Sequence, residues 1–455
     1  MTSQKRQLFG TDGIRGIAGE FPLTSETTYW IGRALGHDLL KLNPQPRVVI
    51  GRDTRESGAW ITGRVAGGLQ SCGVEVHDAG VITTPGVAYL ARSRGYAAGV
   101  VISASHNPWT DNGIKVFSGD GYKLPDSREL AIEHEIFSLL EKGEAAPPSR
   151  ETLTEDASLR GEYIQYLSRS IGKGLGSLKP LVDCANGAAA AEAPELFRVC
   201  GIQADFLNIS PDGRNINENC GALHPKVVAQ AVAAAKGKYD LGITFDGDAD
   251  RALFCDRKGK IIDGDAVLLL AARDLQARGQ LTGSQVVATT MSNMGLEVAL
   301  RASGICLLRA NVGDKYVLEE MKAKGAILGG EQSGHIIFRD GEATTGDGLL
   351  TALRVMEVMV RMDKGLAELV QDLKVFPQTI KNIRVREKTP FEQVPQIKSA
   401  IDAGQRELNG NGRVVVRYSG TETLARVMVE AESEQKMHSI TEKIAAAIQD
   451  ALGAN

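Results

Sequence analysis

Short apolar runs, each followed by a polar turn, recur along most of the chain. Three of them share one design, in which a strand-like run leads through the turn into a helix-like run, at residues 47–53, 180–187 and 285–293. Strand and helix signals that alternate in this way predict α/β units with largely parallel sheets. These segments lie more than 100 residues apart, so the repeating unit is a domain. Such turns also occur in α/β proteins without repeats, so the pattern alone leaves a three-fold repeat open.

Breaks in the pattern predict where domains end. Pro147 and Pro148 interrupt the chain after a helix-like run at residues 127–141. A new strand-turn opens at residues 258–260, and helical runs at 349–362 and 365–373 stop ahead of Pro377. We therefore predict four domains, at residues 1–150, 151–256, 257–374 and 375–455.

The last part of the chain has a different pattern. Alternating, strand-like runs occupy residues 380–386, 414–418 and 425–431, and a helix-like run closes the chain at 433–452. Strands that alternate between polar and apolar residues are typical of a sheet with one covered face. We expect a smaller C-terminal α+β domain after the α/β domains.

Composition and charge exclude several classes of protein. The chain has 455 residues and a net charge of -4, which argues against a nucleic-acid partner. No apolar run approaches the ~20 residues that a membrane-spanning helix needs, and no signal segment opens the chain, so we expect no membrane partner. Six scattered cysteines without a close CxxC pair indicate thiols in a reducing compartment. We therefore expect a cytoplasmic enzyme.

The loop at residues 246–251 carries aspartates at alternating positions. It follows the apolar run 241–245, so Asp246, Asp248 and Asp250 share one short turn at a strand end. Carboxylates this close repel one another strongly without a cation, and their oxygens are the ligands that Mg²⁺ prefers. The EF-hand calcium pattern fails because no Glu follows at the closing position. We favour a metal site over the alternative of a solvated acidic turn.

A second loop, at residues 103–108, follows the apolar run 98–102. Ser105 and His106 precede an Asn-Pro turn, and Lys115 follows closely enough to fold back over the serine. A hydroxyl at a strand end suits an exposed nucleophile or a covalent phosphate carrier. The hydrolase motif GxSxG is absent. The chemistry alone leaves a purely structural Ser–His pair as an equal alternative.

Two further loops predict ligand contacts. In the segment 329–335, Glu331, Ser333 and His335 alternate between glycines, which suits a polyhydroxylated ligand or else a capped polar turn. In the segment 417–422, hydroxyls, a glycine and an arginine form a potential anion cradle for phosphate. No Walker loop and no GxGxxG motif occur, which disfavours nucleotide binding.

Taken together and in this order, the four loops resemble the α-D-phosphohexomutase superfamily over essentially the whole chain. The segments 9–16 (FGTDGIRG), 291–295 (MSNMG) and 344–348 (TTGDG) are most similar to its bacterial phosphoglucosamine mutase branch. The resemblance implies an α/β fold with three related α/β domains with mixed sheets and a smaller C-terminal α+β domain around a central cleft.

The resemblance also implies a role for each loop. Ser105 corresponds to the phosphoserine that carries a covalent phosphate, and one Mg²⁺ per chain is implied at Asp246, Asp248 and Asp250 together with the Ser105 phosphate. His106 and Lys115 are implied in proton handling and orientation, and Arg251 in steadying the transferred group. The implied substrate-binding residues are Arg15, Lys315, Glu331, Ser333, His335, Arg417, Ser419, Gly420, Thr421 and Arg426.

The implied reaction is the reversible conversion of glucosamine 6-phosphate to glucosamine 1-phosphate through a sugar 1,6-bisphosphate, which feeds amino-sugar nucleotide and cell-wall precursor synthesis. The implied partner is thus a small hexosamine phosphate. The only protein partner that we expect is a second copy of the chain, in a homodimer. A phosphoglucomutase or phosphomannomutase, an inactive sugar-phosphate sensor and a Mg²⁺-dependent phosphatase are the alternatives. Two residues depart from the family motifs: Ala249 stands where glycine is frequent, and Thr423 where proline is usual.

Overall fold

The computed structural model describes residues 7–10, 12–148, 153–172, 174–419 and 423–454. Within it the chain divides into two compact units. The first consists of Met1–Thr290 and Leu308–Val370, and the second of Met291–Leu307 and Gln371–Asn455. Each unit is described by itself below.

The first unit begins with a six-stranded sheet in the order β1-β2-β6-β5-β3-β4. Strand β3 is parallel to both β4 and β5, whereas β6 is antiparallel to β5 and β2, so the sheet is mixed. Because β4 and β5 lie on opposite sides of β3, the carboxyl ends of β3 and β5 form a topological switch point, where α/β proteins bind ligands. The strands are β1 (Phe9–Gly10), β2 (Gly13–Ile17), β3 (Arg47–Arg52), β4 (Glu75–Val81), β5 (Ala98–Ile102) and β6 (Asp111–Ser118).

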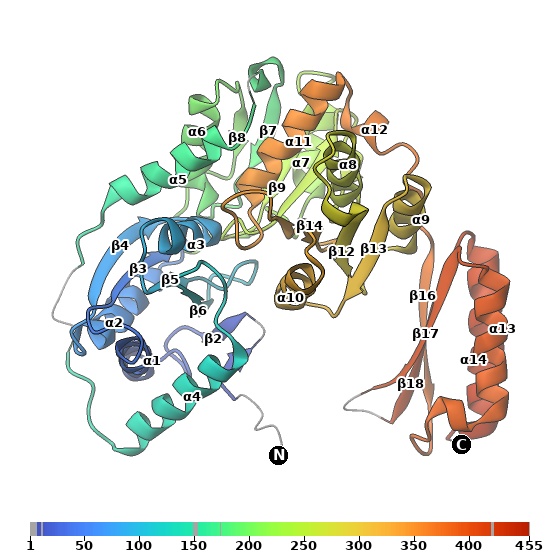
Figure 1. Ribbon diagram of the computed structural model, residues 1–455, viewed down its shortest axis with the longest axis horizontal. Helices are drawn as coiled ribbons and strands as arrows, with labels where there is room; N and C mark the ends of the chain where they lie inside the picture. Colours follow the sequence, from blue (N-terminus) through green and yellow to red (C-terminus); the bar gives the residue numbers. More distant parts are fainter. Residues whose placement is uncertain (1–6, 11, 149–152, 173, 420–422, 455) are drawn as a thin grey trace. The chain divides into compact units, whose positions relative to one another are not determined.

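Helices cover both faces of this sheet (Figure 1). Val48 and Ile50 of β3 pack into one apolar cluster with residues of α1, α2 and α4, whereas Val49 packs into another with residues of α3 and α5. Successive strand residues point to opposite faces, so a strand covered on both sides is a continuous apolar run. The helices are α1 (Ser25–Leu40), α2 (Gly58–Gln70), α3 (Thr84–Ser93), α4 (Asp126–Glu141) and α5 (Ala157–Arg169).

Two more mixed sheets complete the first unit. The five-stranded sheet has the order β11-β10-β9-β7-β8, and the four-stranded sheet has the order β13-β12-β14-β15. Both combine parallel pairs with antiparallel ones. Their strands are β7 (Pro180–Asp183), β8 (Asp205–Leu207), β9 (Leu241–Phe245), β10 (Ala252–Asp256), β11 (Ile261–Ile262), β12 (Gln285–Thr289), β13 (Cys306–Ala310), β14 (Leu328–Gly330) and β15 (Ile336–Phe338). The helices are α6 (Ala189–Val199), α7 (Lys226–Ala234), α8 (Gly264–Ala277), α10 (Asp314–Lys324), α11 (Gly348–Met362) and α12 (Leu366–Leu369).

The second unit is an antiparallel sheet in the order β16-β18-β17, with α13 and α14 side by side on one face (Figure 1). Asn293 joins α9 to this unit, since its amide donates to the Phe376 carbonyl at 3.0 Å and accepts from the Phe376 N–H at 2.8 Å. The elements are α9 (Met294–Ala302), β16 (Gln378–Arg384), α13 (Pro395–Leu408), β17 (Gly412–Tyr418), β18 (Leu424–Ala431) and α14 (Glu434–Leu452). The α/β fold class with a smaller C-terminal α+β domain is confirmed.

Two details differ from the sequence prediction. The helix expected at residues 365–373 is only the four-residue α12, because Val370 leaves the helical region with φ -124° and ψ 19°. Four residues are too few to form a stable helix alone, so tertiary packing of the buried Leu366 holds it. The helix α13 was not predicted.

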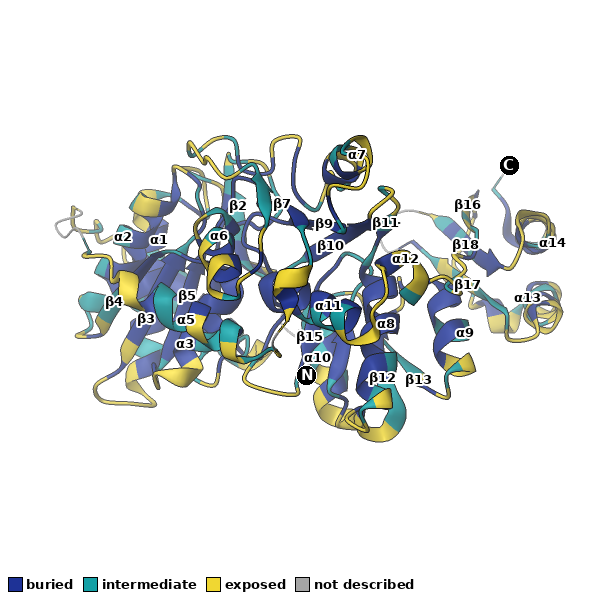
Figure 2. Cartoon of the chain, turned by 90° about the horizontal axis from the view of Figure 1, so that it is seen from above, coloured by how far each residue is buried: buried dark blue, intermediate teal, exposed yellow. Residues whose placement is uncertain are grey.

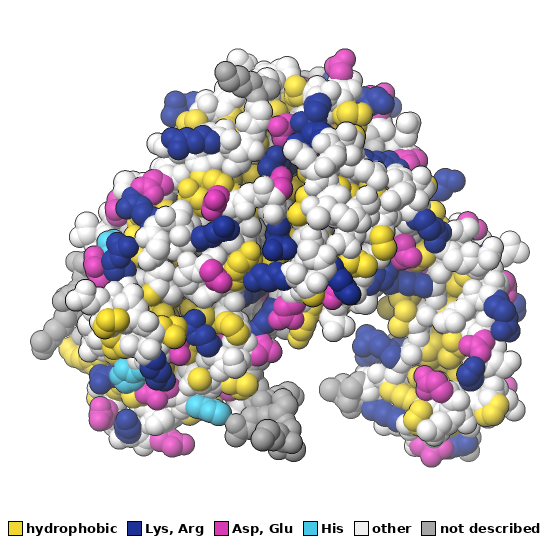
Figure 3. All heavy atoms as spheres, in the orientation of Figure 1, with side chains coloured by type: hydrophobic (Ala, Val, Ile, Leu, Met, Phe, Trp, Pro, Cys, Tyr) yellow, Lys and Arg dark blue, Asp and Glu magenta, His cyan; other side chains and the backbone are white. Residues whose placement is uncertain are grey.

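The central strands of the sheets are buried, and the surface carries charges of both signs. The central strands β3, β5 and β9 are buried in Figure 2. On the face drawn in Figure 3, Lys and Arg side chains are interspersed with Asp and Glu. Among the helices that the structure describes, none is long and apolar enough to cross a membrane.

Candidate active site

The three predicted aspartates lie together in the turn between β9 and β10. Asp246, Asp248 and Asp250 are buried, and one carboxylate oxygen from each lies within 4.8 Å of the others. Asp248 Oδ1 and Asp250 Oδ1 are buried and, in the described part of the chain, accept no hydrogen bond. Buried carboxylate oxygens that have no hydrogen-bond partner are suitable ligands for a hard cation such as Mg²⁺. This donor set therefore fits the predicted metal.

Ser105 lies against this turn at the carboxyl end of β5. Its hydroxyl donates to Asp246 Oδ2 at 2.6 Å, and His106 Nδ1 lies 3.3 Å from the same Ser105 oxygen. The serine is 1% exposed, so it is buried rather than exposed as the strand-end pattern suggested. Both Ser105 and Ala249 have a φ of 53°, a left-handed conformation that glycine adopts more easily. The two loops that meet here therefore each contain one strained residue.

Lys115, on β6, brings a positive charge to the aspartates. Its ammonium donates to Asp248 Oδ2 at 2.8 Å and lies 3.0 Å from Asp12 Oδ2 and 3.7 Å from Asp250 Oδ2. Burial opposes this charge, but the carboxylates outweigh it and hold the pKa of Lys115 above its usual value. Burial and the other two carboxylates raise the pKa of Asp246. One ammonium thus only partly offsets the acidic cluster.

A cavity of about 410 Å³ opens beside these groups. It is lined by several predicted site residues, namely Arg15, His106, Asp250, Arg251, Glu331 and His335, and by Asp12 and Asp314, which were not predicted. Arg251 lies 3.8 Å from Asp250 Oδ1 through its Nε. Cations and carboxylates around one polar cavity suit a ligand with hydroxyl and phosphate groups.

His335 is held in one orientation. The Gly346 N–H donates to His335 Nε2 at 3.1 Å, and His335 Nδ1 lies 3.6 Å from Asp250 Oδ2. Burial lowers the pKa of His335, but Asp250 and Asp314 raise it to about 9 overall, which favours a charged ring. The Gly346 hydrogen bond instead requires Nε2 to carry no proton. A doubly protonated ring would oppose the Gly346 N–H with a second N–H, so this hydrogen bond outweighs the attraction of the carboxylates for a charged ring. It assigns the neutral tautomer with its proton on Nδ1.

Two predicted substrate residues make contacts of other kinds. The Lys315 ammonium bonds to the Asp126 carboxylate and lies 3.6 Å from Glu129 Oε2, both on α4. Ser333 donates to Glu331 Oε2 at 3.3 Å. Neither Lys315 nor Ser333 is among the described residues that line the cavity.

The predicted phosphate loop belongs to the second unit. Arg417 on β17 lies directly opposite Arg426 on β18, and like charges in such a pair destabilise a sheet unless an anion offsets them. Lys388, which sequence reasoning missed, donates to the Ser419 carbonyl at 2.7 Å. Gly420 and Thr421 lie outside the described residues. The described part of this loop therefore gathers cations, as an anion site requires.

Two buried residues that the sequence reasoning missed hold the serine loop from behind. Arg55 Nη2 donates to the carbonyls of Ser105 at 3.0 Å and Asn107 at 2.9 Å, and Nη1 donates to the Pro108 carbonyl. Asn217 Nδ2 donates to the Ser105 carbonyl at 2.9 Å and to the Asn107 carbonyl at 3.2 Å. We call these donors the carbonyl clamp. Arg55 stands in the charged run after strand β3, and nothing in that run distinguishes it from an ordinary loop residue.

The clamp residue Arg55 is itself held by a buried carboxylate. Its Nε donates to Asp53 Oδ2 at 2.9 Å, with both side chains 0% exposed. Ser103 Oγ donates to the same carboxylate at 2.6 Å and accepts from the Ser105 N–H at 2.9 Å. The end of β3 thus sets the backbone of the serine loop at the switch point.

The aspartate loop is held in the same way. The Thr84 N–H donates to the Asp248 carbonyl at 3.0 Å, and its hydroxyl donates to the Asp248 side chain. The Gly348 N–H donates to the Ala249 carbonyl at 2.9 Å. The start of α3 and the start of α11 therefore position the metal ligands.

The four domain descriptions of one family match the chain in order. Phosphoglucomutase/phosphomannomutase alpha/beta/alpha domain I matches residues 6–142, domain II residues 161–259, domain III residues 263–376 and the C-terminal domain residues 380–447.

Similar proteins agree with this match. A phosphoglucosamine mutase of Koribacter versatilis is 59% identical over 100% of this chain and 99% of that protein, and one of Solibacter usitatus is 52% identical over 98% and 99%. The crystal structure of a phosphoglucomutase/phosphomannomutase family protein from Burkholderia thailandensis has a TM-score of 0.79 and 26% identity over 98% of this chain and 99% of that one. The Aspergillus fumigatus N-acetylphosphoglucosamine mutase in complex with GlcNAc-6P and magnesium shares the fold, with a TM-score of 0.60 and 20% identity over 99% and 96%. The chain therefore belongs to the phosphoglucomutase/phosphomannomutase family.

Proposed function

We propose that this phosphohexomutase interconverts glucosamine 6-phosphate and glucosamine 1-phosphate, with Ser105 as the covalent phosphoryl carrier. One observation carries the proposal: the Ser105 hydroxyl donates to Asp246 Oδ2 inside a buried cluster of aspartates that also holds the Lys115 ammonium. Full-length relatives named phosphoglucosamine mutase support glucosamine as the sugar.

The reaction has two half-reactions that conserve phosphate. In the first, the P–O bond to Ser105 Oγ breaks as a P–O bond forms to the free hydroxyl of the sugar phosphate. The proton that the sugar hydroxyl loses is balanced by the one that Ser105 Oγ gains as it leaves, and His106 Nδ1, 3.3 Å from Ser105 Oγ, is placed to deliver a proton to that oxygen. The bisphosphate then turns around, and Ser105 Oγ takes the phosphoryl group from its other end. The enzyme regains its phosphate and the sugar is isomerised.

The surrounding residues serve charge and orientation. Asp246, Asp248, Asp250 and an oxygen of the Ser105 phosphate would hold Mg²⁺. When bound there, Mg²⁺ supplies positive charge that offsets the negative charge of the phosphoryl group. Arg251 lines the same cavity and adds a second charge. Ser105 is 1% exposed, so bulk water has little access to the oxygen that would carry the phosphate.

The sugar and its second phosphate are bound by the remaining predicted residues. Glu331 and His335 line the cavity and offer partners to sugar hydroxyls. Arg417, with Arg426 opposite it and Ser419 beyond, supplies positive charge to the phosphate that does not react. Arg15, Lys315 and Ser333, together with Gly420 and Thr421, complete the proposed substrate site.

Ser105→Ala tests whether Ser105 is the covalent carrier. Ser71→Ala is the control, because Ser71 lies at the end of α2 and has no proposed role in the reaction. Each protein is incubated with glucosamine 1,6-bisphosphate and Mg²⁺, and intact mass and mutase activity are measured. We expect one added phosphate and full activity in the control, and neither in Ser105→Ala. Near-normal activity of Ser105→Ala would refute the relay. If the wild type releases phosphate faster than it isomerises the sugar, it is a phosphatase. If the wild type exchanges no phosphoryl group with the bisphosphate, it is a sensor.

The sugar is tested by comparing kcat/KM for the 6-phosphates of glucosamine, glucose and mannose. We expect the largest value for glucosamine. A larger value for glucose or mannose would assign the phosphoglucomutase or phosphomannomutase activity instead.

The proposal extends to the setting of the enzyme. All six cysteines are free thiols, which fits a cytoplasmic enzyme that binds a small sugar phosphate, with no nucleic-acid and no membrane partner. The domain boundaries proposed after residues 150, 256 and 374 predict cleavage there in limited proteolysis. Light scattering tests the proposed homodimer.

A further inference from the structure

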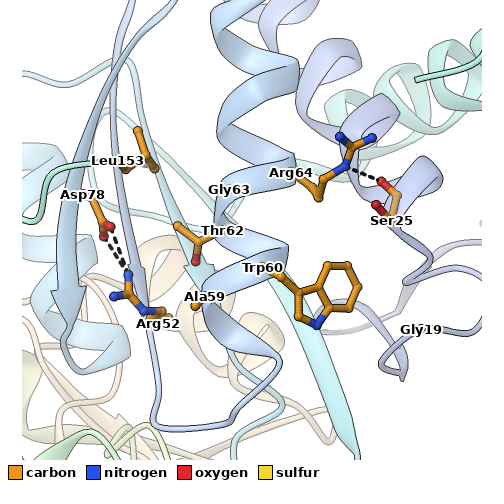
Figure 4. Close-up of a pocket in the computed structure, with 10 residues that line it drawn as sticks. All are labelled: Gly19, Ser25, Arg52, Ala59, Trp60, Thr62, Gly63, Arg64, Asp78 and Leu153. Carbon is orange, nitrogen blue, oxygen red and sulfur yellow. Dashed lines mark hydrogen bonds and ion pairs between the residues drawn. The ribbon is translucent and has the colours of Figure 1, made fainter. Parts of the chain in front are cut away.

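A cavity larger than that of the active site, about 690 Å³, lies beside helix α2, but its polar side chains do not converge (Figure 4). In Figure 4 Thr62 leaves α2 on the side of Arg52 and Asp78, whereas Trp60 and Arg64 lie on the other side of the helix. Two backbone carbonyls already hold the Arg64 guanidinium. Polar groups that face a common space lie instead in the active-site cavity, whose lining includes an aspartate without a role in the proposed reaction.

The proposed substrate carries one group that sets it apart from its closest competitor. Glucosamine 6-phosphate has an ammonium at C2 where glucose 6-phosphate has a hydroxyl, so an inference about this group rests on the proposed function. An ammonium offers three donors, no acceptor and a positive charge, whereas a hydroxyl is neutral and can donate or accept. A carboxylate whose charge the protein leaves incompletely neutralised therefore favours the amino sugar.

Four carboxylates line the described part of the active-site cavity, and two of them are already engaged. Asp250 belongs to the proposed metal site, and Asp12 forms ion pairs with three cationic side chains. Asp314 pairs with one ammonium, that of Lys123, and shares it with Asp12. Glu331 forms no ion pair within the described ranges. The negative charge that remains for a ligand therefore lies at Asp314 and Glu331.

One carboxylate oxygen of Asp314 is held by the protein and the other is left for a ligand. Lys123 Nζ donates to Asp314 Oδ2 at 2.6 Å, and His335 Nε2, which carries no proton in the neutral tautomer, lies 3.7 Å from the same oxygen. Asp314 Oδ1 accepts no hydrogen bond from the residues that the structure describes. The Gly313 N–H donates to Glu331 Oε1 at 3.2 Å, which places the Glu331 carboxylate beside the start of α10, where Asp314 lies.

We propose that Asp314 determines the specificity for the amino sugar, by accepting a hydrogen bond from the C2 ammonium at Oδ1. Glu331 beside it accepts from a hydroxyl that glucosamine and glucose share. Glucose 6-phosphate presents a C2 hydroxyl to Asp314, and this group can donate one hydrogen bond but does not offset the charge of the carboxylate. Lys123 is a positioning residue, because its bond to Oδ2 leaves Oδ1 for the substrate.

The test compares kcat/KM of the full chain for glucosamine 6-phosphate and glucose 6-phosphate, each with Mg²⁺ and the matching 1,6-bisphosphate. Asp314→Asn keeps the shape of the side chain and removes its charge. We expect kcat/KM for glucosamine 6-phosphate to fall about 10–100-fold through the lost charge-assisted hydrogen bond, and the value for glucose 6-phosphate to change less than about threefold. A merely structural role of Asp314 would lower both values together and leave their ratio unchanged.

Control variants separate the possible outcomes. Asp402→Asn removes an exposed ion pair to Lys398 on α13 and should keep the wild-type ratio. Asp314→Ser removes the same charge with a smaller side chain and should shift the ratio as Asp314→Asn does. A wild-type ratio or loss of all activity in both Asp314 variants, or a ratio that shifts in Glu331→Gln and not in Asp314→Asn, would overturn the assignment of Asp314. A wild type that prefers glucose 6-phosphate would overturn the proposed function instead, and the shift in Asp314→Asn would still decide the role of Asp314.

Discussion

Arg55→Met tests whether the carbonyl clamp holds the serine loop. The substitution keeps an apolar side chain of similar length but leaves Asp53, 1% exposed, without its cation. Breaking a buried ion pair in this way costs about 3–5 kcal/mol. The Ser105 and Asn107 carbonyls keep the Asn217 donor, so most of this cost comes from Asp53. Local opening of the loop should therefore become easier by about 3 kcal/mol or more.

Hydrogen–deuterium exchange of peptides that cover residues 103–110 measures this opening. A loss of about 3–5 kcal/mol corresponds to exchange about 10²–10⁴-fold faster than in the wild type. Arg257→Gln is the matched control, because it breaks an exposed ion pair to Asp240, and it should leave this exchange unchanged. Mutase kcat should fall in Arg55→Met with the displaced serine, while KM changes little.

The pH dependence has a definite sign. Burial already raises the pKa of Asp53 and the Arg55 charge lowers it, so Arg55→Met raises the pKa further. A carboxyl whose pKa is higher in the folded than in the unfolded protein does not destabilise the fold at pH values below the unfolded-state pKa. The loss of stability grows as pH rises from that value to the folded-state pKa. The exchange ratio of variant to wild type should thus be larger at pH 8 than at pH 5.5.

Two results would refute this reasoning. One is exchange of residues 103–110 in Arg55→Met within twofold of the wild type. The other concerns Asp53→Asn/Arg55→Met, which removes the buried charge and should be more stable than Arg55→Met alone. A double variant that is less stable would show that the Asp53 charge is not the source of the cost.

Three further predictions follow from other contacts. In Gly247→Ala the new Cβ would lie 2.5 Å from the Ser105 carbonyl, so turnover should fall by about 10²-fold, whereas Gly341→Ala, whose Cβ meets nothing within 4 Å, should be neutral. Burial raises the pKa of Glu192 to about 8, so wild-type stability should fall by about 5 kcal/mol as pH rises from 4.5 to 8, and thermal melts of Glu192→Gln should lack this loss. Asp248→Asn should weaken Mg²⁺ binding in calorimetry at least about tenfold through the lost charge, and chelation of Mg²⁺ should abolish wild-type turnover. Unchanged turnover in Gly247→Ala would contradict the first prediction. The second would be contradicted if Glu192→Gln lost as much stability between pH 4.5 and 8 as the wild type does. A wild-type Mg²⁺ affinity for Asp248→Asn would contradict the third.

Local features of the chain were readable from the sequence. The apolar runs predicted β3, β7 and β12, and alternating runs predicted the sheet β16-β18-β17, because hydrophobic periodicity reflects which faces are covered. The aspartate loop was readable because its three carboxylates lie within five residues and follow a buried strand. The ordered motifs identified the family, which the comparisons confirm.

What the sequence did not contain is which distant residues meet. Ser105 and Asp246 are 141 positions apart, and only the packing of two sheets brings the hydroxyl and the carboxylate to 2.6 Å. Arg55 and Asn217 stand in charged and polar runs that look like ordinary loops, and they became visible as a clamp through buried contacts with backbone carbonyls. Such contacts leave no periodic signal, because carbonyls are present at every residue. Local patterns thus determined the elements and the chemistry available, whereas the tertiary structure decided which groups share one buried site.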